Sequence, residues 1–173
     1  MDKSAFNKKR QEKRKIIWVS KYKNKLRKFD GIDTTKLAYA AGILDGEGCI
    51  IIAKGNPKKG VRLTPQYSLK VIVGMSNPSA TSWLFETFGG NLKLKPNHQY
   101  KPVHTWSCLS IQAEGFLRCI LPYLKVKRIE AELALDFREH INNYIRKNGR
   151  IIDKTEIEKR ETYKIKLQEL KRG

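Results

Sequence analysis

The stretch that most constrains the fold is LAYAAGILDGEGCI, residues 37–50, in which small apolar residues lead into two acids and two glycines. Asp33, Thr34 or Thr35 can cap a helix that runs to about Asp45, where the glycines end it. A carboxylate at this end meets the partial negative charge of the helix, which is mildly unfavourable. A bound divalent cation would reverse that penalty. Tight packing inside one core and an exposed acidic turn are the plainer alternatives.

Acids are scarce in this chain, which carries 36 Lys and Arg against 17 Asp and Glu, a net charge of +19. That balance predicts a polyanionic partner, with nucleic acid ahead of an anionic membrane surface. No apolar run approaches the roughly 18 residues of a membrane span, so we expect no membrane association. The three cysteines are odd in number and far apart, which favours free thiols in a reducing, intracellular compartment.

The hydrophobic periodicity predicts an α+β fold in the order α-β-β-α-β-β-α-α, followed by a C-terminal helix. Residues 62–74 alternate, with Leu63, Tyr67, Leu69, Val71 and Val73 on the face expected to be buried. The long helix shows Ile129, Leu133, Phe137, Ile141 and Ile145 at i, i+4 spacing. Strands are predicted at 49–56, 62–74, 91–95 and 103–109, and helices at 34–45, 77–88, 113–121, 126–145 and 155–170.

We expect three segments: a basic N-terminal arm (1–33), a core (34–147) and a C-terminal helix (148–173). Residues 1–28 hold twelve Lys and Arg against two acids. Such a segment is either solvated or an arm that binds nucleic-acid backbone, and the rest of the chain favours the second interpretation.

The predicted strands and turns form a cationic surface, because eight Lys and Arg lie between Cys49 and Ser107 with a single acid, Glu86. Polar side chains accompany them, and these can read base edges while the cations neutralise phosphates. The predicted DNA-binding residues are Lys54, Asn56, Lys58, Lys59, Arg62, Thr64, Gln66, Ser68, Lys70, Asn91, Lys93, Lys95, Asn97, Gln99, Lys101 and His104.

The nonapeptide AAGILDGEG, residues 40–48, resembles the LAGLIDADG motif of homing endonucleases, of the type with one motif per chain. The resemblance covers roughly residues 34–147. It implies the αββαββα fold with a saddle-shaped antiparallel sheet, and a homodimer in which two motif helices pack against each other. The interface residues that it implies are Ala38, Ala41, Gly42 and Asp45.

The same resemblance implies a Mg²⁺ site made by the Glu47 carboxylate and the Gly46 carbonyl, while Asp45 ties the helix end by hydrogen bonds. Mn²⁺ is expected to substitute, and Ca²⁺ to support binding without efficient cleavage. A second match, PYLKVKR at residues 122–128, resembles the family segment that brings a catalytic lysine, here Lys127. The plainer interpretation of Lys127 is a surface lysine at a helix start. The chain departs from the family where relatives place Gln and Arg near the active site, because Met75 and Ser79 stand there.

The resemblance implies an intron-encoded endonuclease that hydrolyses phosphodiester bonds in double-stranded DNA, across the minor groove, to leave 3′ overhangs. The implied target is a long pseudo-palindromic site. The alternatives are an RNA maturase that binds its intron RNA and a relative that binds nucleic acid without cutting it. An intracellular setting follows, either the bacterial cytoplasm or an organelle.

Overall fold

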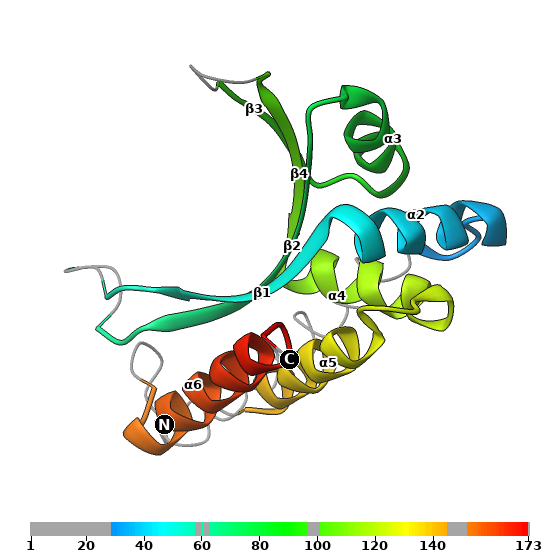
Figure 1. Ribbon diagram of the computed structural model, residues 1–173. Helices are drawn as coiled ribbons and strands as arrows, with labels where there is room; N and C mark the ends of the chain where they lie inside the picture. The colour runs from blue at the N-terminus through cyan, green and yellow to red at the C-terminus, as the bar shows by residue number, and fades with distance from the viewer. Residues whose placement is uncertain (1–28, 58–59, 61–62, 97–100, 145–151, 173) are drawn as a thin grey trace, which may run out of the picture.

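The computed structural model describes residues 29–172 except 58–59, 61–62, 97–100 and 145–151. The elements follow the predicted order (Figure 1). They are α2 (Thr34–Glu47), β1 (Gly48–Gly55), β2 (Gln66–Met75), α3 (Pro78–Phe88), β3 (Asn91–Lys95), β4 (Val103–Leu109), α4 (Ser110–Ile120), the 3₁₀ turn η2 (Leu121–Tyr123), α5 (Arg128–Asn143) and α6 (Lys154–Glu169). The predicted α+β fold with an antiparallel sheet is confirmed.

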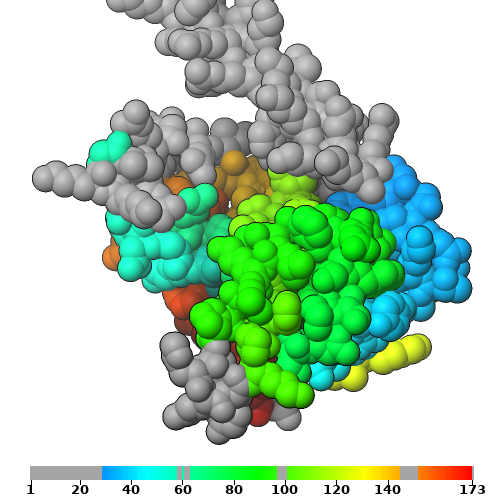
Figure 2. Space-filling model, turned by 90° about the horizontal axis from the view of Figure 1, so that it is seen from above, coloured from blue at the N-terminus to red at the C-terminus, as the bar shows by residue number. Residues whose placement is uncertain are grey.

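The four strands form one curved, open sheet in the order β1-β2-β4-β3, with every neighbouring pair antiparallel. All the labelled helices lie on its convex side, and the concave side is free of described elements (Figure 1). From above, the β1–β2 hairpin and α2 lie on opposite sides of the segment that contains α3 and β3 (Figure 2). The sheet therefore offers one covered face and one open face.

The core lies between the sheet and the helices. Alternate residues of the strands enter it, including Ile50 and Ile52 of β1, Leu69 of β2 and Trp106 of β4. Glu114 of α4 is also fully buried. Its carboxylate accepts hydrogen bonds from Arg118, Arg138 and Asn142, which joins α4 to α5 and satisfies a charge that burial would otherwise make costly.

The folded body extends beyond residues 34–147 at both ends. Phe29 is buried and stacks on Phe88 of α3, with ring centroids 6.3 Å apart. At the other end, Leu167 of α6 belongs to the same hydrophobic core. Glu156 and Arg160 of α6 form a buried ion pair at 2.6 Å. The C-terminal helix is thus an integral layer of the fold.

Three local predictions were wrong. The helix does not end at Asp45, because α2 continues through Glu47 and the chain turns at Gly48 directly into β1. A Cβ on Gly48 would lie 2.2 Å from Leu44 Cδ1 and 2.7 Å from its carbonyl oxygen, so this turn requires glycine. Leu63 precedes β2 and is 61% exposed, and Ile129 is 65% exposed at the start of α5. Ile145 lies outside the described residues.

Within the described part of the chain, every helix is too short or too polar to span a bilayer.

Candidate active site and nucleic-acid face

Asp45 lies in the last turn of α2 and reaches the start of α5, about eighty positions further along the chain. The backbone N–H groups of Lys125 and Val126 donate to its Oδ2 at 2.8 and 3.2 Å, and that of Lys127 donates to Oδ1 at 2.9 Å. Partial burial opposes ionisation of this carboxyl, but the three backbone donors outweigh it and hold its pKa below the usual value. The predicted tie at the helix end is therefore present in the structure.

Lys127 is the N-cap residue of α5, and its own side chain makes no capping hydrogen bond there. Its ammonium Nζ turns back and donates to the backbone carbonyl oxygen of Asp45. The C-terminal end of a helix carries partial negative charge, so a cation is stabilised at this position. Lys127 thus binds both the side chain and the backbone of Asp45. Its ammonium lies at the end of α2 that carries Gly46 and Glu47.

Glu47 is the last residue of α2 and is exposed. Within the described residues it makes no hydrogen bond or ion pair, in contrast to Asp45 two positions earlier. The two acids of the motif therefore have different surroundings: Asp45 is fully engaged by the protein, whereas Glu47 is available to an external group.

The donors at this end of α2 are hard oxygens, which Mg²⁺ and Ca²⁺ prefer. They comprise the Glu47 carboxylate and the carbonyls of the last turn, which a helix end leaves without intrahelical partners. No cluster of three or more His, Cys, Asp and Glu is placed to hold a metal in the part of the chain that the structure describes. The residues fit a divalent cation in chemistry, but a single chain supplies only part of a ligand shell.

The predicted interface residues fall on two sides of α2. Ala41 is fully buried against the chain's own core, so its contact with a second chain, implied by the resemblance, is sterically blocked. Ala38 and Gly42 are exposed on the opposite side, and a Cβ at Gly42 would meet nothing within 4 Å. Beside them, Tyr39 is 54% exposed and packs edge-on against Trp83 of α3.

The open face of the sheet carries part of the predicted DNA-binding set. Register and alternation place Gln66, Ser68 and Lys70 of β2 on this face, together with Asn91, Lys93 and Lys95 of β3. The described residues of this face include these three lysines and no acid. This face also has an apolar part, formed by Ile51 of β1 and Ile72 of β2. The sequence analysis did not predict it.

Lys54 corrects the surface prediction. It follows Ile50 and Ile52 in the alternation of β1 and therefore points to the helix side, where its ammonium lies 2.7 Å from Glu161 of α6. His104 likewise shares its face with Trp106, the core side.

The remaining predicted DNA-binding residues lie outside the strands or outside the described structure. Asn56 and Lys101 are exposed in loops, and Thr64 Oγ1 accepts a hydrogen bond from the Ile152 backbone N–H. Lys58, Lys59, Arg62, Asn97 and Gln99 lie outside the described residues, as does the basic segment 1–28.

Several solved structures of homing endonucleases share this fold. I-CvuI in complex with a DNA target superposes with a TM-score of 0.62 at 19% identity, over 79% of this chain and 82% of that chain. I-TnaI gives 0.55 at 15% identity, over 79% and 93%. The archaeal intron-encoded I-Vdi141I, complexed with DNA, gives 0.53 at 12% identity, over 80% and 98%. This chain has the LAGLIDADG homing endonuclease fold. No protein-family model and no curated protein matches it by sequence.

The capping role of Asp45 predicts a pH-dependent loss of stability in Asp45→Asn. At pH 7 we expect the free energy of unfolding, from urea denaturation, to fall by about 1 to 3 kcal/mol, because hydrogen bonds to a charged acceptor are lost. Asp30→Asn, at an exposed position, serves as the control.

A lowered pKa contributes stability that is present above the unfolded value, about 3.9, and is lost as pH falls through the folded value. The difference between wild type and Asp45→Asn should therefore shrink below about pH 4. A difference that stays constant from pH 7 to pH 3 would contradict the ionised cap.

Proposed function

We propose that this chain is an intron-encoded, site-specific endonuclease of double-stranded DNA that acts as a homodimer with a divalent cation. The observation that carries the proposal is the arrangement at the end of α2. There Asp45 binds the backbone N–H of Lys127, and the Lys127 ammonium donates to the Asp45 carbonyl, in the same helical turn that carries the unbound carboxylate of Glu47. The basic open face of the sheet and the fold shared with DNA-bound homing endonucleases support it. Cleavage across the minor groove, leaving 3′ overhangs, belongs to the same proposal.

In this proposal the protein groups have separate tasks. Glu47 and the Gly46 carbonyl would hold Mg²⁺, for which Mn²⁺ substitutes. The cation would supply Lewis-acid polarisation of the phosphate and a lower pKa for an attacking water. Lys127 stabilises negative charge that develops on the scissile phosphate. Asp45 does not react, but it fixes the position of Lys127.

A homodimer completes what one chain lacks. Each chain carries a single motif, and a two-fold pair would bring two Glu47 carboxylates together over a pseudo-palindromic site. Two like charges at close range repel one another, and phosphate increases that repulsion, so cations are needed for the assembly to accept DNA. The exposed Ala38 and Gly42 allow two α2 helices to approach closely.

Glu47→Gln tests the metal role, because it keeps the size of the side chain and removes its charge. We expect specific DNA binding to persist, and cleavage of the target with Mg²⁺ to fall about a hundredfold or more. Glu86→Gln, an exposed acid of α3, should cut at the wild-type rate. Ca²⁺ should support binding by the wild type with little cutting. Wild-type cleavage by Glu47→Gln would refute the assignment, and preferential binding to intron RNA without cutting of DNA would favour a maturase.

The two sides of the sheet predict different salt dependences of DNA affinity. Lys93→Ala, on the open face, should reduce the slope of log affinity against log salt by about 0.9, the value for one lost phosphate contact. Lys159→Ala removes the same charge from α6, on the covered side, and should leave the slope unchanged. Equal effects of the two substitutions in a fluorescence anisotropy titration would show that the open face is not the binding surface.

Gly42→Leu tests the dimer. The folded single chain has room for the new side chain, since a Cβ there meets nothing within 4 Å. Between two closely packed helices the same side chain should cost about 1 to 3 kcal/mol, a rise of about 5- to 150-fold in the dimer dissociation constant measured by sedimentation. Glu158→Leu, at an exposed position of α6, is the matched control. Unchanged dimerisation in Gly42→Leu would place the interface elsewhere.

A further inference from the structure

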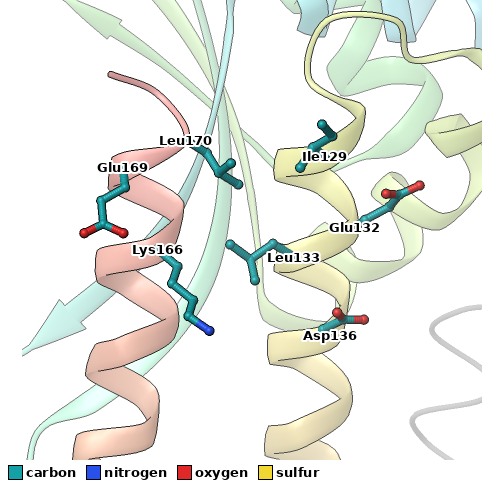
Figure 3. Close-up of a pocket in the computed structure, with 7 residues that line it drawn as sticks. All are labelled: Ile129, Glu132, Leu133, Asp136, Lys166, Glu169 and Leu170. Carbon is teal, nitrogen blue, oxygen red and sulfur yellow. The ribbon is translucent and has the colours of Figure 1, made fainter. Parts of the chain in front are cut away.

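The convex side of the molecule carries a groove of about 710 Å³ between α5 and α6. Leu133, Leu170 and Ile129 lie along its middle (Figure 3). Two of these are unusually open for large apolar side chains, with Ile129 65% and Leu170 43% exposed. The groove therefore presents an apolar strip to solvent on the side of the sheet opposite the proposed DNA face.

Carboxylates stand on both banks of this strip. Glu132 and Asp136 project from the α5 bank and Glu169 from the α6 bank (Figure 3). Asp136 and Glu169 form no ion pair within the described residues, whereas Glu132 is bound to Arg128 at 3.1 Å. Lys166 is the one cation among the lining residues. In a chain of net charge +19 such a site is exceptional, and it favours an occupant that is both apolar and basic.

We infer that the occupant is the chain's own N-terminal segment, residues 1–28. This segment combines a net charge of +10 with the apolar run Ile16-Ile17-Trp18-Val19, which Lys and Arg precede. The apolar run matches the strip between the helices. The flanking cations match Asp136 on the α5 bank and Glu169 on the α6 bank, which outnumber Lys166, the lysine that points into the gap (Figure 3). Burial of the exposed leucine and isoleucine side chains supplies the driving force, and charge complementarity sets the position.

The segment can reach the groove. Phe29, the first described residue, is packed in the core beneath the helices, so residues 1–28 join the body on the covered side of the sheet. The thirteen Cα–Cα steps from Ile16 to Phe29 span up to about 40 Å when extended. That matches the diameter of about 38 Å of a sphere with a radius of gyration of about 15 Å, the value expected for a compact domain of this size.

Docking in this groove would hold the ten net charges of the segment away from the open face of the sheet. The inference does not rest on the proposed endonuclease function, because it uses only the composition of the segment and the chemistry of the groove. A different basic partner, and the segment of a second copy, are outcomes that the experiment separates.

The test uses the full chain and a zero-length carbodiimide cross-linker, which joins lysines to carboxylates in direct contact. Light and isotopically heavy protein are mixed before reaction, so that links within a chain and links between chains differ in mass. We expect links from lysines of residues 1–28 to Asp136 and Glu169 within one chain, at least about tenfold above links to the exposed acids Glu158 and Glu86. Raised salt should weaken them.

A second readout is the rate at which trypsin cleaves the Lys and Arg bonds of residues 1–28. Asp136→Lys/Glu169→Lys should increase that rate several-fold, and the matched Glu86→Lys/Glu158→Lys should not. Links distributed evenly over all exposed acids, or equal trypsin rates in the two double variants, would overturn the inference. Links only between light and heavy chains would also overturn it, because the groove would then hold another molecule's segment.

Discussion

The contact on which the candidate site depends is the hydrogen bonding of the Asp45 carboxylate to three successive backbone N–H groups at the start of α5. A helix begins with unpaired N–H groups and partial positive charge, which an ionised acid satisfies. Most helices obtain that acceptor from the preceding residues, as α2 does from Asp33 and α6 from Asp153. The chain supplies it to α5 from a different helix, so the cap is also a tertiary bond that fixes Lys127 against the end of α2.

The same end of α2 is constrained on its other side by Gly48. Because Gly48 has no Cβ, the chain can turn from α2 into β1 while the side chain and carbonyl of Leu44 pack directly against the turn. Glu47, between Asp45 and Gly48, is therefore held by its backbone although its side chain is unbound. A rigid backbone with an available carboxylate is the arrangement that a preorganised ligand for an external cation requires.

The regular elements were predictable because their signals are local. Asp33 caps α2 as expected, and alternation along β2 placed Tyr67, Leu69, Val71 and Val73 in the core. Predictions about partners were less accurate, because the residue at the other end of a contact lies far away in sequence. From sequence alone, Lys54 resembles the other lysines of the predicted DNA-binding strands. Only the register of β1 and the position of α6 reveal that it pairs with Glu161. Similarly, Ala41 and Gly42 are equivalent as small residues, but their faces of α2 differ. The role of Asp45 came from family resemblance, since no local pattern points to residues 125–127.

The composition of the exposed side of α2 bears on the proposed dimer. A glycine inside a helix costs about 1 kcal/mol relative to alanine, and no described residue requires one at position 42, where a Cβ has open space. Gly48, by contrast, is required by the chain's own packing, because a Cβ there would lie closer than 3 Å to atoms of Leu44. Gly42 lacks any such neighbour and lies beside the exposed Ala38 and the aromatic pair Tyr39–Trp83. No described residue therefore makes a small residue necessary at this position. In the proposed homodimer a second α2 helix would do so and would also bring a second Glu47, so the same proposal accounts both for the open strip on α2 and for the incomplete set of metal ligands at its end.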